Sequence, residues 1–262
     1  WLRTFDLETP NGVVLPQGIH FALCTPQTHS RQLGEDGHPA RDRSAHGFLP
    51  PFPQFGSGPR RMWASSAMEF FSPITMGSFV ERFSRVASIN EKEGSSGKLA
   101  FVEIEHETMA NQRLAIREPQ TLVYREAAAP DAPLSPPEPG DGAFDFTEWD
   151  AKQTLTPDER LLFRYSAVTF NTHRIHYDAP YARNVERYRG LVVHGPLTAT
   201  LMLGLAAKEL GDNAVRTFEF RGVSPAIAGE MLHIAMRKSA DGYELGAFAQ
   251  DGRQVMKGFA ST

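Results

Sequence analysis

The sequence predicts an α+β fold of two similar halves, in which a long antiparallel sheet wraps around a central apolar helix. A short pattern occurs twice, in MEFFSPITMGSFVERFS from Met68 and in FEFRGVSPAIAGEMLHIAM from Phe218. Strand-like segments of alternating polarity follow each copy, and an apolar helical segment precedes the second. Together these two observations favour a duplicated fold over two unrelated domains.

The two copies share the residues that mark the end of one strand and the start of the next. Ser72-Pro73 and Gly77 in the first copy correspond to Ser224-Pro225 and Gly229 in the second. A proline and a glycine around a short link are typical of a chain that turns between strands. We therefore interpret the two copies as an internal repeat.

Alternating polarity predicts the strands themselves. Residues 232–237 read Leu-His-Ile-Ala-Met-Arg, a period-two pattern for a strand that is buried on one face. Asp251-Gly252 then supplies a favoured pair for a tight hairpin turn. In the first half, we expect strands over residues 78–89, 98–109 and 120–127, with a turn at 93–97.

Two helices are expected ahead of the second group of strands. Thr156-Pro157-Asp158-Glu159 resembles a capping box with proline at the first helical position, so a helix should begin there and end near Phe170. A second helix should begin at Gly195-Pro196 and stop at Gly211. This second segment is apolar nearly all round, which predicts a helix buried on most of its sides.

The chain divides at a proline-rich segment, residues 127–146, which should act as a semi-rigid connector. We therefore predict an N-terminal half over residues 1–126 and a C-terminal half over residues 147–262. Residues 27–58 are rich in Gly, Pro, Ser and His and read as a surface excursion or a degenerated element.

Composition narrows the classes of function. The formal net charge is −4 and no basic block occurs, which argues against nucleic acid and against an anionic membrane surface as partners. The single cysteine, Cys24, excludes an internal disulfide and fits a reducing compartment. With no long apolar run and no signal-peptide pattern, we expect a cytoplasmic location.

The stretch FNTHRIHYD, Phe170 to Asp178, concentrates groups that can do chemistry. His173 and His176 can exchange protons near neutral pH. His194-Gly195 lies at the start of the buried helix, where unpaired backbone N–H groups and the positive end of the helix dipole favour an anion. A base and an oxyanion site suit a reaction through an enolate-like intermediate.

A metal site is the alternative interpretation of the same stretch. His173 and His176 form an HxxH pair, which could share one helical face. No third cluster with a carboxylate or a cysteine stands out in the sequence, so we predict that no metal is bound.

The stretches RYSAVTFNTHRIHYDAPYA and GLVVHGPLTATLM resemble the hydratase motif of the MaoC-like, double-hotdog enoyl-thioester hydratases and dehydratases. "FN-x-HRIHYD" resembles the signature of the branch that holds the type 2 hydroxyacyl-thioester dehydratases and the mesaconyl- and itaconyl-CoA hydratases. PRRMWASS is similar to the first hotdog of this branch. The resemblance, from about Phe48 onward, implies a double hotdog whose first half is degenerate and non-catalytic.

The resemblance also implies roles at single positions. His176 stands at the catalytic histidine and would activate the water that adds to the β-carbon. Asn171 stands where the general pattern has a catalytic aspartate, and Phe170 stands where it has a glycine. An amide cannot act as a base, so Asn171 would only hold water or the thioester. Gly195 would offer its N–H to the thioester oxygen.

His173 and Arg174 replace an Asn-Pro pair of the general pattern, and both are candidates for substrate binding. Arg174 could pair with the free carboxylate of a dicarboxylic acyl group. A structural salt bridge to Asp178 or Glu186 is an equal alternative.

His194 is a further candidate for substrate binding, although a role at the start of the helix is favoured over catalysis. Arg60 and Arg61 are candidates for contacts to the coenzyme A phosphates, with solvated surface arginines as the alternative.

The resemblance implies reversible hydration of a short, branched dicarboxylic enoyl-CoA, itaconyl- or mesaconyl-CoA, to citramalyl-CoA. One alternative is dehydration of 3-hydroxyacyl thioesters, carried on coenzyme A or acyl carrier protein, in fatty-acid synthesis. Thioester hydrolysis and non-catalytic acyl-CoA binding are further rivals. We expect no cofactor beyond the coenzyme A of the substrate. A homodimer is compatible with the resemblance.

Overall fold

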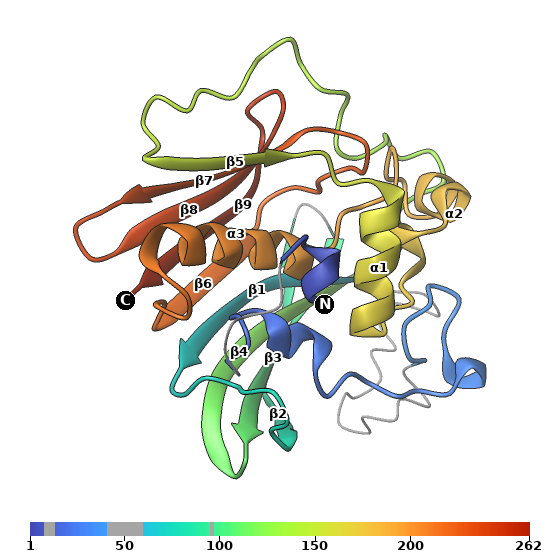
Figure 1. The fold of residues 1–262 in the computed structure, drawn as a ribbon. Helices are drawn as coiled ribbons and strands as arrows, with labels where there is room; N and C mark the ends of the chain where they lie inside the picture. The colour runs from blue at the N-terminus through green and yellow to red at the C-terminus, as the bar shows by residue number, and fades with distance from the viewer. Residues whose placement is uncertain (8–13, 41–59, 95–96) are drawn as a thin grey trace.

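The computed structural model describes residues 1–7, 14–40, 60–94 and 97–262, and its strands form one antiparallel sheet (Figure 1). The first half contributes four strands and the second half contributes five. The strands are β1 (Arg60–Phe70), β2 (Val80–Gly94), β3 (Gly97–Ala110), β4 (Arg113–Arg125), β5 (Ala151–Leu155), β6 (Thr217–Gly222), β7 (Leu232–Lys238), β8 (Tyr243–Ala249) and β9 (Gln254–Ser261). Their order is β2-β3-β4-β1-β6-β9-β8-β7-β5, so the pairing of β1 with β6 joins the halves.

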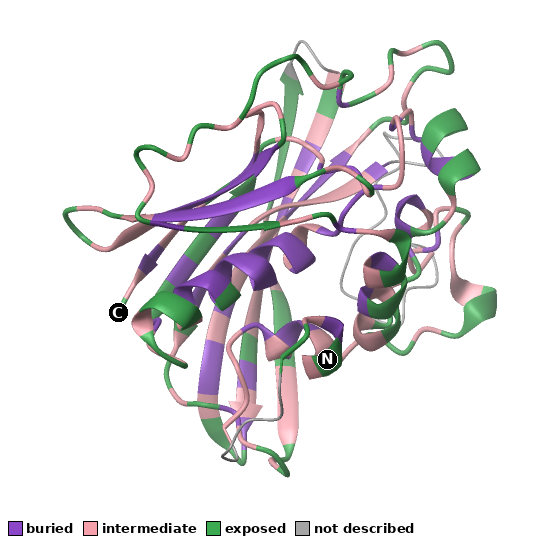
Figure 2. Ribbon diagram, turned by 45° about the horizontal axis from the view of Figure 1, so that its top comes forward, coloured by how far each residue is buried: buried purple, intermediate pink, exposed green. Residues whose placement is uncertain are grey.

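Helix α3 (Gly195–Leu210) lies on the inner face of the sheet and packs against β5, β7 and β8 (Figure 1). Its middle is buried, as Figure 2 shows, because apolar residues occupy nearly every side. The other helices are α1 (Glu159–Thr169) and α2 (Ala179–Asn184), with single 3₁₀ turns η1 (Leu2–Thr4), η2 (Ile19–Ala22), η3 (Ser30–Gln32) and η5 (Arg174–His176). Among the described residues, no helix combines the length and apolarity needed to cross a bilayer.

The predicted repeat recurs in the hydrogen bonds of the two halves. Ser72 donates its hydroxyl to the carbonyl of Leu114 (2.9 Å), and Ser224 donates its hydroxyl to the carbonyl of Gln254 (2.6 Å). The backbone bonds correspond in the same way. The matched N–H to carbonyl pairs are Leu15–Ile74 with Val193–Ala226, and Phe71–Ala115 with Val223–Val255.

The halves differ where the central helix should lie. When the two halves are aligned by their matched hydrogen bonds, η2 occupies the position at which α3 begins. It ends after one turn, and Cys24, two residues later, has a positive φ of 50°. Phe21 of η2 packs edge-on against Trp63, with 5.5 Å between ring centroids. A cavity of about 430 Å³ remains beside η2, lined in part by Gln17 and Ile116. The degenerated element therefore lies upstream of residues 27–58, of which 41–58 fall outside the described residues.

Two predicted starting points are wrong, and strand β2 also runs five residues past its expected end at residue 89, to Gly94. Strand β4 begins at Arg113, seven residues before the expected start, because Asn111 and Gln112 adopt left-handed φ values of 50° and 64° and make a tight turn from β3. Helix α1 begins at Glu159, and its N-cap is Asp158, whose Oδ1 accepts the N–H of Leu161 (2.9 Å). Proline and threonine precede this cap and are not part of the helix.

Residues 127–146 carry no helix or strand and run along the second half. The ring of Phe144 stacks on Phe248, with 4.1 Å between centroids and 17° between planes. Strand β5 was not predicted. Three of its five residues are exposed, so its sequence lacks the apolar alternation of the other strands.

Candidate active site

The histidine motif occupies the loop that leaves α1. This helix ends at Phe170, whose φ is +52° and whose N–H bonds to carbonyls of the last turn. Only residues that tolerate the left-handed conformation suit this position, and glycine suits it best. This conformation gives a physical reason for the glycine that the general hydratase pattern has here.

His176 lies at the end of the single turn η5 and is buried. Its Nδ1–H donates to the carbonyl of Val192 (2.7 Å). Because a carbonyl can only accept, Nδ1 carries the hydrogen, and Nε2 of the neutral ring carries the lone pair. Burial lowers the pKa of His176 to about 4. The ring is therefore neutral at physiological pH and can take up a proton at Nε2.

His194 connects this imidazole to the start of α3. The rings of His176 and His194 stack, with 3.6 Å between centroids and 20° between planes. The Nε2 atom of His194 hydrogen bonds with the hydroxyl of Ser166 (2.8 Å), and burial holds the pKa of His194 well below its usual range. Since His194 is the N-cap of α3, the stack places His176 beside Gly195.

Gly195 is the first residue of α3, and Pro196 follows it. No hydrogen-bond partner for the N–H of Gly195 occurs in the part of the chain that the structure describes. This N–H lies at the positive end of a buried 16-residue helix. The two histidines and this amide thus combine a proton acceptor with a site for a developing oxyanion.

Asn171 has a structural role in the same loop. Its Oδ1 accepts the N–H of His173 (2.9 Å), which closes a turn between two residues. The amide oxygen is therefore engaged in shaping the loop. If Asn171 holds water or the thioester, as predicted, only its amide nitrogen is left to donate the hydrogen bond.

His173 is buried between two other imidazoles. The ring of His38 lies 4.0 Å away, and the ring of His176 lies edge-on at 5.3 Å. Burial, followed by the charges of neighbouring His38, His176 and Arg61, lowers the pKa of His173 far below its ordinary value. A neutral, packed ring supports the loop and is not a cation for the substrate.

Arg174 forms the structural salt bridge that was one of its two predicted roles. Its Nε and Nη2 donate to Oδ2 of Asp178 (3.0 and 2.7 Å), and its Nη1 donates to the carbonyl of Glu35 (3.0 Å). The guanidinium also lies 4.0 Å from the centroid of the Tyr181 ring. The guanidinium of Arg174 is thus paired with Asp178, the Glu35 carbonyl and the Tyr181 ring, although the side chain keeps 31% exposure.

The two arginines at the start of β1 have different surroundings. Arg60 is 8% exposed, and its guanidinium binds both the side chain and the carbonyl of Glu186. Burial and this pairing occupy the guanidinium, so the geometry does not support a contact from Arg60 to a coenzyme A phosphate. Arg61 is half-buried, and its charge lowers the pKa of Asp36 and of His173, which places it near the histidine loop.

Sequence reasoning missed Asp36 and His38. The side chains of Asp36, His38 and His173 gather as the ligands of a metal ion would. Their candidate ligand atoms all lie within 4.8 Å of one another, and no other such group occurs among the described residues. No carboxylate stood out in the sequence beside the HxxH pair, but the fold brings Asp36 to His173. Its Oδ2 accepts a hydrogen bond from Nδ1 of His38 (3.1 Å), so these two groups satisfy each other. The signal was the short Asp-x-His pattern in residues 36–38.

The sequence pattern of the hydroxyacyl-thioester dehydratase type 2 family matches residues 18–228. The chain belongs to this family. The motifs predicted a resemblance from about Phe48 onward. The match to the family begins earlier, at residue 18. A member of this family is a hydro-lyase, and the predicted enzyme class is confirmed.

A relative and two solved structures agree with this assignment. The chain is 39% identical over 257 residues to the mesaconyl-C(4)-CoA hydratase of Chloroflexus aurantiacus, which covers 95% of this chain and 86% of that protein. HtdX of Mycobacterium tuberculosis has a similar structure, with a TM-score of 0.68, 18% identity and coverage of 99% and 92% of the two chains. Another M. tuberculosis protein, described as a double hotdog fold, gives a TM-score of 0.50 at 15% identity over 98% and 96%. The predicted double-hotdog fold is confirmed.

Proposed function

We propose that the chain adds water reversibly to a short, branched dicarboxylic enoyl-CoA, itaconyl- or mesaconyl-CoA, to give citramalyl-CoA. The relative from Chloroflexus aurantiacus, named a mesaconyl-C(4)-CoA hydratase, supports this substrate class. The observation that carries the chemistry is the neutral His176, stacked on His194 at the start of α3. We assign catalysis to the second half, residues 147–262. The first half, residues 1–126, would carry no catalytic site of its own.

In this mechanism, the thioester carbonyl oxygen accepts the N–H of Gly195. Negative charge grows on that oxygen as water attacks the β-carbon, and the helix terminus stabilises it. Nε2 of His176 takes a proton from the attacking water, so a C–O bond forms while an O–H bond breaks. Protonated His176 then gives this proton to the α-carbon, so a C–H bond forms as the Nε2–H bond breaks and the ring returns to its neutral state. The net change is addition of one water, and no redox group is needed.

Dehydration of 3-hydroxyacyl thioesters is the second candidate, since it is the reaction in the name of the family. The same groups run this reaction in reverse. What separates the candidates is the acyl group and its carrier, on coenzyme A or on acyl carrier protein.

A substrate panel tests the proposal. Mesaconyl-, itaconyl- and crotonyl-CoA are each incubated with the protein, and the enoyl absorbance is followed together with free thiol. We expect loss of the enoyl signal without thiol release, fastest for a dicarboxylic substrate. Thiol release would mean a thioesterase. Turnover of 3-hydroxyacyl thioesters alone would favour the dehydratase, and binding without change would mean a non-catalytic acyl-CoA-binding protein.

Replacing Gly195 with proline should lower kcat by about a hundredfold, since loss of one oxyanion donor has effects of that order. Proline is tolerated in the first turn of a helix, and His194 already has the extended backbone (φ −60°, ψ 134°) that a following proline requires. Steady-state kinetics with the best enoyl-CoA measure the effect.

Gly195→Ala is the matched control, because it keeps the N–H. Apart from its chain neighbours, the one described atom within 4 Å of an added Cβ is Met256 Cε, at 4.0 Å. We expect kcat within a factor of about three of the unmodified protein. Equal losses in both variants would mean that bulk, and not the missing N–H, explains the effect.

A further inference from the structure

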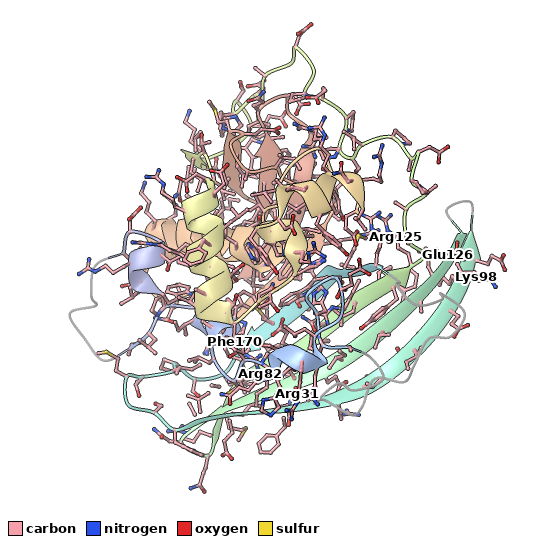
Figure 3. The ribbon with its side chains drawn as sticks, turned by 90° about the vertical axis from the view of Figure 1, so that its right-hand side faces the viewer. Arg31, Arg82, Lys98, Arg125, Glu126 and Phe170 are labelled. Carbon is pink, nitrogen blue, oxygen red and sulfur yellow. The ribbon has the colours of Figure 1, made fainter. Side chains whose placement is uncertain are left out.

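The sheet ends differently in the two halves. Strand β5 pairs with residues 232–236 of β7 and covers the outer edge of that strand. By the repeat that matches Ser72 with Ser224, the counterpart of this stretch is residues 80–84 of β2. Strand β2 is the outermost strand on its side, and in the part of the chain that the structure describes no strand pairs with it there. Figure 3 shows the curved first-half sheet at the lower right and labels Arg82 of β2.

Alternate residues of β2 direct their backbone groups to this outer edge. Phe79, just before the strand, faces β3, because its N–H donates to Oδ1 of Asn111 (2.9 Å) and its carbonyl accepts the N–H of Asn111 (2.9 Å). The direction alternates from residue to residue in an antiparallel strand. The N–H and carbonyl groups of Arg82 and Ser84 therefore face outward, where a further strand can bind them.

This outer edge is limited at both ends. The carbonyl of Val80 accepts the thiol of Cys24 (3.5 Å), and the pairing of β2 with β3 is irregular between Val86 and Ser88. A bulge twists a strand and ends regular pairing along its edge. Residues 81–85 lie between these limits and are regularly paired with β3 on the inner side.

The side chains of residues 81–85 are apolar at the centre and charged at the ends. The ring of Phe83 is 58% exposed. Glu81 and Arg85 lie on the same face of the strand as Phe83, since side chains alternate between the two faces. Arg85 forms an ion pair with Glu105 of β3, yet its side chain is 74% exposed. Charges on an edge strand usually discourage association, but here they are opposite in sign and symmetric about Phe83.

The stretch is complementary to itself in one register. When two copies run antiparallel about a two-fold axis at Phe83, this ring meets its own copy, and Glu81 lies opposite Arg85 of the other chain, twice. The outward backbone groups of Arg82 then meet those of Ser84. Moving the axis by one residue places Arg82 opposite Arg82, or Ser84 opposite Ser84, and removes both ion pairs. Aromatic and opposite-charge pairs across strands are favourable.

We propose that two copies of the chain associate through this edge, residues 81–85 of β2, and continue the sheet across a two-fold axis at Phe83. The occupant of the edge is a second copy because one strand supplies both the acid and the base of each ion pair. The proposal does not depend on the hydratase function. It concerns the end of the sheet opposite to β5, and its test is the oligomeric state.

Sedimentation velocity of the full-length chain, from about 1 to about 100 μM, is the first test, because weak interfaces dissociate in this range. We expect a mass of twice 29.1 kDa at the upper end. Phe83→Lys should raise the dissociation constant about tenfold or more, because it removes the ring and places two like charges on the axis. The control is Phe163→Lys, whose ring on α1 is 68% exposed, and it should leave the dimer unchanged. A monomer at every concentration of the unmodified protein would overturn the proposal.

Charge reversal tests the register. Glu81→Arg and Arg85→Glu should each weaken the dimer, since each places like charges opposite one another. The double variant restores opposite charges, so its dissociation constant should return to within about threefold of the unmodified value. Circular dichroism and the melting temperature check that each variant is folded. A double variant no better than the single variants would contradict the proposed pairing.

A crosslink locates the two-fold axis. In a Cys24→Ser background, Phe83→Cys places two thiols opposite each other, at a Cβ separation of about 5 Å, from which a disulfide needs only a small adjustment. With oxidised glutathione as oxidant, we expect a covalent dimer on a non-reducing gel. Phe163→Cys in the same background should stay monomeric on the gel. A dimer in solution that Phe83→Cys does not crosslink would mean that another face associates.

Discussion

His176→Asn should lower kcat by at least about a hundredfold while KM stays within a factor of about three. The asparagine amide nitrogen lies where Nδ1 of the imidazole lies, so it can still donate to the carbonyl of Val192. The variant keeps this buried bond and removes the lone pair that accepts a proton. Loss of a general base has effects of this size.

Kinetics on the best substrate of the panel, with the melting temperature as a check of folding, give the answer. His176→Gln is a useful companion, because its longer amide reaches toward the Nε2 position and does not replace the bond to Val192. We expect it to be inactive and also less stable. A kcat within fivefold of the unmodified protein in His176→Asn would remove His176 from the mechanism.

Acid should destabilise the fold strongly between pH 7 and pH 5. Burial lowers the pKa of His173, His176 and His194 in the folded chain, whereas each should titrate near 6.5 when unfolded. In this range the unfolded chain binds protons at these rings and the folded chain does not. Unfolding therefore takes up protons, and the free energy of unfolding falls as the pH falls.

The size of the effect follows from the same linkage. At pH 5, each ring contributes a loss of roughly 2 kcal/mol, so the three together approach 6 kcal/mol, a large part of the stability of an ordinary domain. Glu118 acts in the opposite direction, since burial raises its pKa. Urea unfolding at pH 7.5, 6 and 5 measures the slope. His173→Gln should reduce the slope, and a flat profile in the unmodified protein would contradict the prediction.

The periodic elements of the fold could be predicted from sequence because their signals are local. The apolar segment that forms α3 begins at Gly195 and stops before Gly211, as expected, and the repeat around Ser72 and Ser224 recurs in matched hydrogen bonds. Strand β5 was not predicted, because its sequence lacks apolar alternation. The early start of β4 was not predicted either, because it depends on left-handed φ values at Asn111 and Gln112.

The candidate site was predictable only within its own motif. The sequence suggested that His176 would face the start of the apolar helix, and the ring stack with His194 brings them together. Asp36 and His38 could not be found in this way, since their contacts join segments far apart in the chain. Nor could the sequence separate Arg60 from Arg61, because neighbouring residues on a strand point to opposite faces.

The seam between β1 and β6 has a consequence for how such a protein changes over time. Five residue pairs join Ser65–Glu69 to Thr217–Arg221, so one covalent chain makes a contact that two separate subunits would have to find by diffusion. Tethering makes this association independent of protein concentration. Each half is then free to diverge, which explains how η2 of the first half can end after one turn while α3 of the second half extends over 16 residues.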